Sequence, residues 1–417
     1  MNPDKSTPVV LLRAVSHLGV GLARSFGRWG VPVYAVESGA MTPAFYSRYC
    51  TAHFSWSLEE SAPEDTLAFL VSIARRLGRR AVLLPTRDQA AIFMAEHRES
   101  LEPWFKFWRM SPDLTHSLCS KRVFYAMAER FGVPVPETYF PEAHAEAAEV
   151  AERIPYPALL KAADGDRMMR LTGRRMFRVH DAEELLRTFD AIGDPQNVMI
   201  QSYIPGPEDS CWIFHGYFDR DSNCVAAYTG KKARQCRAYG GDTAFGITCN
   251  NETIKRDAIR FLSGVGYSGI VDACIRFDAR DGLYKFLDIN PRIGANARMF
   301  VSASGMDLAR LYYLDITGQT CAAEPVPDGR KWVVEDYDLV SSYRYWRDGN
   351  LSVRDWLRSI QHIDEYGYWS LGDPLPAFAR IAQNSAELIR RLSGTNKASR
   401  PAIASDGQQG KPTSKAA

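Results

Sequence analysis

The chain has 417 residues, of which 46% are hydrophobic and 24% charged, so it can bury a large core and form two or three domains. Its net charge of 51 − 49 = +2 gives no argument for a nucleic-acid or acidic-membrane partner. The eight cysteines form no Cys-x-x-Cys pair, and no run approaches about 18 uninterrupted apolar residues. We therefore expect a soluble cytoplasmic protein with reduced cysteines and neither a zinc site nor a disulfide scaffold.

The first part of the chain predicts a parallel α/β domain that ends near residue 115. A β-α-β unit opens it, with a glycine turn, Gly19-Val20-Gly21, before the helix. Glu37 ends the second strand, where an acid can hold a ribose, so a nicotinamide-dependent oxidoreductase is one alternative. Arg24 stands where the dinucleotide signature has Gly or Ala, which favours a turn that packs the helix on the strand. The predicted elements are strands 9–13, 31–36 and 81–85 and helices 22–29 and 66–77.

Two lysines mark the next part of the chain. Lys121 opens a helix at 120–131, which ends at Gly132 and is followed by Val133-Pro134-Val135-Pro136. After a helix near 142–153, Lys161 lies within an apolar strand at 156–162, where a lysine is rarely placed without a function.

Polar residues also follow the next predicted strands. Gln201 lies near the end of an apolar strand that runs through Ile204 into a Pro-Gly turn, and Glu208 follows Gln201 by seven residues. Two more strands, 210–218 and 224–228, lead to a basic turn at 229–237. Strand alternation predicts that the side chains of Lys232 and Arg234 point to the same side there.

The stretch 264–299 carries the most informative pattern. Apolar runs at 269–277 and 283–289 flank the turn signal Asp278-Ala279-Arg280-Asp281-Gly282, which predicts a β-hairpin. Alternation places Phe286, Asp288 and Asn290 on one face, and a pairing that brings Asp272 near Asp288 would join two carboxylates. Like charges that close need a cation, and hard oxygen ligands suit magnesium.

These motifs, in this order, resemble the ATP-grasp family, which includes biotin carboxylase, carbamoyl phosphate synthetase and D-alanine–D-alanine ligase. Phe286-Leu287-Asp288-Ile289-Asn290-Pro291-Arg292 is similar to the family's hydrophobic-acid-hydrophobic-Asn-Pro-Arg signature. The resemblance covers roughly residues 5 to 320. It implies a Rossmann-like domain, then an ATP-grasp fold whose two α+β subdomains clamp the nucleotide, and a small C-terminal appendage.

The resemblance also implies roles for the residues above. It assigns ATP contacts to Lys121, Lys161, Gln201 and Ile204, with the ribose on Glu208, and metal ligation to Asp272, Asp288 and Asn290. Cys274 stands where the family expects its first metal ligand, and Asp272 is the candidate substitute because a thiol binds magnesium poorly. The candidate catalytic residues are Lys232, Arg234 and Arg292, the last beside the oxyanion of a tetrahedral intermediate.

The implied activity is an ADP-forming ligase that joins a carboxylate to an amine through an acyl phosphate, with ATP and Mg²⁺, or Mn²⁺, as cofactors. The alternative from another class is a nucleotide-binding regulatory protein without catalysis, motivated by Cys274 and Gln201. Small-molecule substrates are the expected partners, and a homo-oligomer is left open. The expected domains are 1–115, 116–205, 206–325 and 331–396, with a disordered tail at 397–417.

Overall fold

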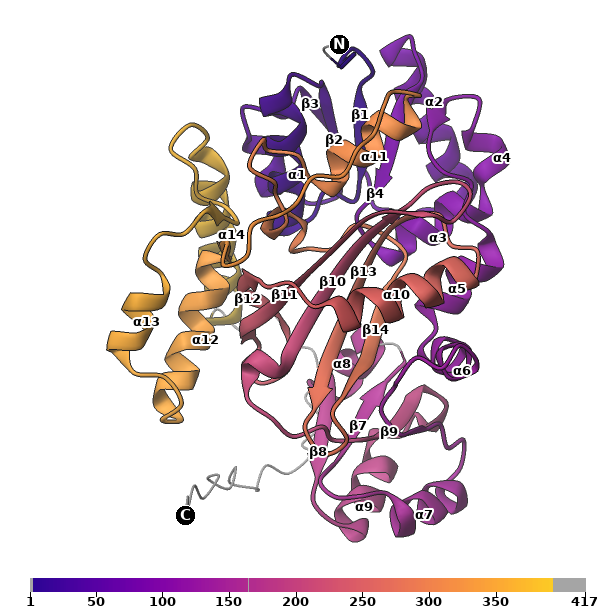
Figure 1. The fold of residues 1–417 in the computed structure, drawn as a ribbon, viewed down its shortest axis with the longest axis vertical. Coiled ribbons are helices and arrows are strands. Elements are labelled where there is room, and N and C mark those ends of the chain that lie inside the picture. The colour runs from indigo at the N-terminus through magenta and orange to yellow at the C-terminus, as the bar shows by residue number, and fades with distance from the viewer. Residues whose placement is uncertain (1–2, 164, 393–417) are drawn as a thin grey trace. The chain divides into compact units, whose positions relative to one another are not determined.

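The computed structural model describes residues 3–163 and 165–392 (Figure 1). They form two compact units, the smaller of which is Pro136–Tyr203, while the larger contains the residues up to Val135 and Ile204–Leu392. The smaller unit therefore begins after the helix at 120–131 rather than near residue 116. Phe124 of that helix packs against Phe261, with ring centroids 5.9 Å apart, which ties it to the larger unit. The tail predicted at 397–417 lies outside the described residues.

The N-terminal part of the larger unit is the predicted parallel α/β domain. Its five strands are all parallel, in the order β3-β2-β1-β4-β5. Val9 and Leu11 face one hydrophobic core and Val10 and Leu12 face another, as strand alternation requires. The elements are β1 Val9–Leu12, α1 Ser16–Trp29, β2 Val33–Glu37, η1 Pro43–Tyr46, β3 Ala52–Ser55, α2 Pro63–Leu77, β4 Ala81–Pro85, α3 Asp88–Glu96, α4 Arg98–Leu101, β5 Phe105–Lys106, α5 Pro112–Cys119 and α6 Lys121–Arg130.

The rest of the larger unit is built on a seven-stranded sheet in the order β14-β13-β10-β11-β12-β15-β16. Figure 1 labels its strands β10 to β14. All neighbours are antiparallel except the short pair β15 and β16. The elements are η3 Glu208–Ser210, β10 Cys211–Phe218, β11 Cys224–Cys236, β12 Asp242–Thr248, α10 Glu252–Gly264, β13 Gly269–Asp278, β14 Leu283–Asn290, η4 Ala297–Met299, α11 Leu308–Ile316, β15 Lys331–Val333, α12 Glu335–Arg347, α13 Val353–Ser359, β16 Glu365–Tyr366 and α14 Leu375–Leu392.

The segment 229–237 is not the basic turn that its charges suggested. It forms the second half of β11, and its ladder with β12 is irregular between Lys232 and Arg234. A bulge interrupts simple alternation, so two residues at i and i+2 need not share surroundings.

The C-terminal part is joined to the rest of the larger unit rather than appended to it. Strand β15 pairs with β12, and the residues after it reach back to the N-terminal domain. Arg24 of α1 donates to Asp373 at 3.0 Å, and both side chains are about 1% exposed. Helix α11 also packs on α1 (Figure 1). No helix among residues 3–163 and 165–392 has the length and hydropathy needed to cross a membrane.

The smaller unit is an antiparallel sheet with helices packed on it. The strand order is β6-β9-β7-β8, and one hydrophobic core joins the strands to α7 and α9. The elements are β6 Thr138–Tyr139, α7 His144–Arg153, β7 Ala158–Ala162, α8 Gly165–Thr172, β8 Met176–Val179, α9 Ala182–Ile192, η2 Pro195–Asn197 and β9 Val198–Ser202.

Candidate active site

A cavity of about 150 Å³ lies within the larger unit, where the end of the β13–β14 hairpin meets the N-terminal domain. Its walls come from β11, β12, β13 and β14, from the first turn of α1 and from the loop after β4. The carboxyl ends of β1 and β4 lead into this cavity, and this is the edge of a parallel sheet where ligands usually bind.

The hairpin register decides which polar groups meet in the cavity. Cys274 lies opposite Asp288, and Asp272 lies opposite Asn290, so Asp272 and Asp288 are near each other as diagonal neighbours rather than as a directly opposite pair. All four of these residues line the cavity wall. The register shifts just after Cys274, so that Phe286 pairs with Ile275 and is fully buried. This shift removes Phe286 from the face it was predicted to share with Asp288.

Asp272 is already matched by protein groups. Its Oδ1 lies 2.9 Å from Nε2 of His215, and its Oδ2 accepts from Asn290 and from Arg292, both at 3.2 Å. Burial opposes ionisation, but His215, Arg292 and Lys232 together hold the pKa of Asp272 below its ordinary value. The geometry therefore suits Asp272 to positioning its neighbours more than to ligating a metal.

Asp288 is the contrasting case. It makes no hydrogen bond or ion pair with another described residue, although it lines the same cavity. Burial raises its pKa, and Lys121 is the strongest of the charges that oppose this rise. A half-buried carboxylate with no partner among the described residues favours a cation from outside the protein.

Magnesium fits this donor set. Asn290 directs its Nδ2 toward Asp272, which leaves its Oδ1 available beside Asp288. Within the described residues no group of three or more His, Cys, Asp and Glu side chains could hold a metal ion by itself. Two protein oxygens are sufficient for Mg²⁺, since it usually takes its other ligands from water and substrate phosphates.

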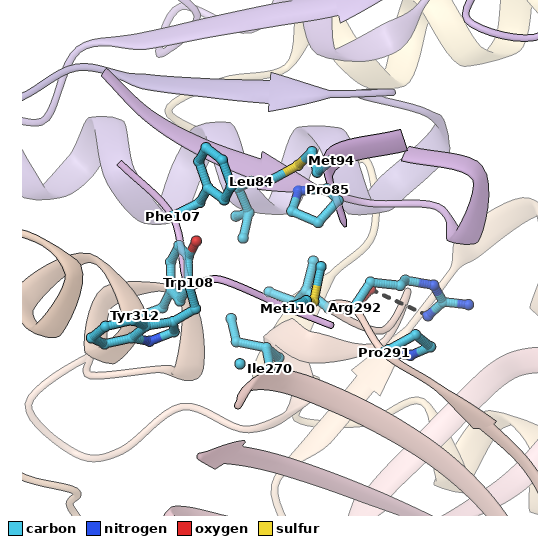
Figure 2. A pocket seen from close by; sticks show the side chains of 12 residues that line it. Leu84, Pro85, Met94, Phe107, Trp108, Met110, Ile270, Pro291, Arg292 and Tyr312 are labelled. Atoms are coloured by element: carbon cyan, nitrogen blue, oxygen red, sulfur yellow. Dashed lines mark hydrogen bonds between the residues drawn. The ribbon is translucent and has the colours of Figure 1, made fainter. Parts of the chain in front are cut away.

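Arg292 is anchored on both sides. Its Nε donates to Asp88 at 3.0 Å and its Nη1 to Asp272 at 3.2 Å, while its Nη2 makes no hydrogen bond within the described residues. Figure 2 shows a small apolar pocket of about 20 Å³ beside it, with Met94 and Tyr312 in the wall and the guanidinium turned away. Asp88, Asp272 and Asp288 outweigh burial and raise the pKa of Arg292, so it stays cationic.

The two predicted cations of β11 have different surroundings. Lys232 lines the cavity, and its only hydrogen bond within the described residues is a long one, 3.5 Å, to the Gly241 carbonyl. Arg234 is buried elsewhere: it donates to Asp338 at 2.6 Å and to Ser359 at 2.9 Å. The assignment of Arg234 to catalysis is therefore corrected to a structural role, in which it fixes the C-terminal helices to the sheet.

Glu208, the predicted ribose ligand, does not line this cavity. Its Oε2 accepts from Gln235 at 2.6 Å, and its carboxylate also interacts with the Tyr345 hydroxyl, whose pKa it helps to raise. Ile204, the first residue of the larger unit after the smaller one, is 4% exposed.

In the smaller unit, two predicted nucleotide residues form one hydrogen-bonded chain. Lys161 on β7 donates to Gln201 on β9 at 2.7 Å, and Gln201 donates to Thr138 on β6 at 2.9 Å. Gln201 is 1% exposed, and its neutral amide orients the lysine without adding a charge.

The glycine turn of the N-terminal domain packs helix on strand, as its incomplete signature suggested. A Cβ on Gly19 would lie 2.4 Å from the Ala14 carbonyl oxygen, and one on Gly21 would lie 2.7 Å from Arg298. Glu37 is occupied by an ion pair with Arg13 and accepts from the Ser38 amide at 2.9 Å. Nothing here favours a nicotinamide site.

Sequence analysis missed His215 and Asn296, which complete the network around Asp272. His215 is fully buried, and its Nε2 lies 2.7 Å from Oδ1 of Asn296. A histidine in the middle of the apolar run Ile213-Phe214-His215-Gly216 carried the same signal as Lys161 in its strand. Asn296 had no such signal because it follows a loop.

Comparison with solved structures identifies the fold. The biotin carboxylase domain of *Hydrogenobacter thermophilus* 2-oxoglutarate carboxylase, solved with MgADP, ADP and bicarbonate, matches with a TM-score of 0.60 at 17% identity, over 79% of this chain and 74% of that one. The chain has an ATP-grasp fold. The L-amino acid ligase of *Bacillus licheniformis* matches this fold with a TM-score of 0.57 at 15% identity, over 79% of each chain.

Sequence comparison agrees with this ATP-grasp assignment. D-aspartate ligase of *Enterococcus faecium* is 24% identical over 305 residues, which cover 70% of this chain and 72% of that protein. The C-terminal section of the carbamoyl phosphate synthase large chain of *Methanopyrus kandleri* is 24% identical over 339 residues, 72% of this chain and 61% of that one. No family model matches the chain.

Proposed function

We propose that this protein is an ADP-forming ligase that joins a carboxylate to an amine, with ATP and magnesium. One observation carries the proposal: the cavity holds an unpaired carboxylate, Asp288, beside Asn290, Lys232 and the anchored Arg292. Asp288 needs a cation, while Lys232 and Arg292 offer positive charge to phosphates nearby. This arrangement suits a metal-bound nucleotide. The names of the similar proteins, D-aspartate ligase and L-amino acid ligase, support the same reaction class.

In the first half-reaction, an oxygen of the carboxylate substrate attacks the γ-phosphorus of ATP. A new P–O bond forms, the bond to the bridging oxygen breaks, and its electron pair leaves with ADP. Magnesium held by Asp288 and Asn290 would neutralise charge on the phosphates when bound. Lys232 adds a fixed positive charge in the same cavity, and Lys121 is close enough to influence Asp288 electrostatically.

In the second half-reaction, the lone pair of an amine attacks the acyl carbon. The C–N bond forms, the C–O bond to phosphate breaks with its electron pair, and the amine nitrogen loses a proton. Arg292 is oriented by Asp88 and Asp272, and its uncommitted Nη2 can donate to the oxyanion of the tetrahedral intermediate. In this scheme Asp272 orients Arg292, and His215 in turn holds Asp272 in place.

The proposal keeps the ATP contacts that the family resemblance implied for Lys161, Gln201, Ile204 and Glu208. Lys161 would contact the α-phosphate and base, with Gln201 fixing its position, and Glu208 would bind the ribose. Backbone groups near Ile204 would read adenine. Mn²⁺ can replace Mg²⁺ in this scheme because both accept oxygen ligands.

The test is ADP release by the full chain with MgATP across a panel of carboxylic acids and amines, with hydroxylamine added to trap an acyl phosphate. We expect ADP formation that depends on an acid, and an amide product when an amine is also present. Asp288→Asn should abolish both, whereas Asp221→Asn, in an exposed turn, is the matched control. Trapped hydroxamate without added ATP, or equal activity in both variants, would overturn the assignment.

A further inference from the structure

One end of the cavity contains groups that the proposed ligation does not use. They lie on the N-terminal domain side, where the first turn of α1 and the loop after β4 form the wall, and β12 supplies Asp242. Within the described part of the chain, the side chains of His17, Arg87 and Asp242 make no hydrogen bond.

His17 is buried without a partner. It is 5% exposed, and both ring nitrogens are buried with no hydrogen bond. The rings of Trp332 and Tyr337 meet it edge-on, with centroids 5.4 and 5.7 Å away, so its apolar surface is packed while its nitrogens are not matched. A buried polar atom left unpaired is unfavourable, which points to a ligand or water that completes its hydrogen bonding.

The first turn of α1 adds hydrogen-bond donors at the same place. Ser16, His17 and Leu18 all line the cavity, and the helix begins after Val15, which has no side chain able to cap it. The first N–H groups of a helix have no intrahelical acceptor, and the helix dipole favours an anion there. Since α1 has 14 residues, its dipole is well developed.

Two charges of opposite sign flank this point. Arg87 precedes α3 and is exposed, and Asp242 begins β12 and is also exposed. Both lie close enough to act on His17: Asp242 raises its pKa and Arg87 lowers it, although burial dominates and lowers the pKa to about 4. Asp242 also acts electrostatically on Lys232, so Asp242 lies on the side of this region that is nearer Lys232, where the proposed function puts the phosphates.

We propose that this end of the cavity binds a free α-amino acid, with its carboxylate on Arg87 and the first turn of α1 and its amino group beside Asp242. Neutral His17 accepts or donates one hydrogen bond to the same molecule. The inference rests on the proposed function, in which this amino acid is the amine substrate. Its nitrogen then faces the end of the cavity that carries Lys232 and Asp288, where the acyl phosphate forms.

The test compares amino acids with their α-carboxamides. Glycine and both enantiomers of alanine, aspartate and lysine, and the corresponding carboxamides, are titrated into the full chain by calorimetry, up to about 10 mM, tenfold above the usual KM range. We expect at least one amino acid to bind, and its carboxamide to bind about 10- to 100-fold more weakly, as for a lost charged hydrogen bond.

The variant Arg87→Met should lower affinity for the amino acid by the same factor and leave the carboxamide unchanged. Arg354→Met is the matched control, because Arg354 is an exposed arginine on α13 with no ion pair in the described part of the chain. His17→Phe keeps an aromatic ring in the packed site and should weaken both the acid and the amide, since it removes a contact that does not depend on charge.

Three outcomes would overturn the inference: no amino acid binds the unmodified protein, Arg87→Met weakens acid and carboxamide equally, or Arg354→Met has the same effect as Arg87→Met. These binding measurements do not require the protein to be catalytically active. If amino acids bind as expected while no acid and amine pair yields ADP, the proposed ligation fails and the amino-acid site stands. If ADP forms with amines but the Arg87 comparison fails, only the site is wrong.

Discussion

Gly294→Ala tests whether the position of Asp272 matters for turnover. A Cβ at residue 294 would lie 2.5 Å from Nε2 of His215 and 2.6 Å from Cγ of Asp272. Ordinary contacts of this kind are about 3.5 Å, so one of the two groups must move by roughly 1 Å. Overpacking of this size destabilises a core by about 1–3 kcal/mol, and a 1 Å displacement of a catalytic group can lower the rate by about 10².

The measurement is kcat for amide formation together with the thermal midpoint of the protein. We expect kcat to fall by about 10², because Asp272 aligns Arg292, while MgATP still binds through Asp288 and Asn290. Gly372→Ala is the control, since no atom lies within 4 Å of a Cβ built there. A lower thermal midpoint with unchanged kcat would refute the positioning role of Asp272.

Three further predictions concern single residues. Asp288→Asn should reduce ADP release by about 10² or more while leaving the thermal midpoint of the ligand-free protein unchanged or higher, since it removes an unpaired buried charge; a lower midpoint would contradict this. Lys161→Met should weaken MgATP binding in calorimetry more than Lys121→Met, because Gln201 fixes Lys161 at 2.7 Å; equal small effects would show that neither contacts the nucleotide. The folded pKa of His17 is about 4, below its ordinary 6.5, so stability is full above about pH 6.5 and falls as the pH drops toward 4. His17→Phe should recover about 2 kcal/mol at pH 5 relative to pH 8 in urea unfolding, and an identical pH dependence in both proteins would exclude this account.

Much of the fold could be predicted because local patterns and tertiary structure agree. The β-α-β unit, strand 81–85 and the hairpin of β13 and β14 all lie where apolar runs and turn signals placed them. The position of Asp288 and Asn290 on one cavity wall could be predicted for the same reason, because both lie in β14 two residues apart. Their roles stay predictions.

The failures come from interactions that alternation does not encode. Lys232 and Arg234 separate because the ladder between β11 and β12 is irregular, and because Asp338, about a hundred residues later, captures the guanidinium. The C-terminal part was expected to be a small appendage, yet Trp332 in it reaches the cavity wall. Partners this distant in sequence leave no local pattern.

The charges of the cavity divide into a part that the protein balances and a part that it leaves for ligands. Asp88, Arg292, Asp272 and His215 form a connected chain of contacts, each between 2.9 and 3.2 Å, so this part is set before a substrate arrives. Asp288 is outside the chain and has no counter-ion there. Cys274 lies opposite Asp288, where a second carboxylate would have added another unpaired charge to a buried wall. A thiol at that position limits the charge left uncompensated in the ligand-free protein, and it leaves Asp288 and Asn290, with the nucleotide phosphates, to hold the metal.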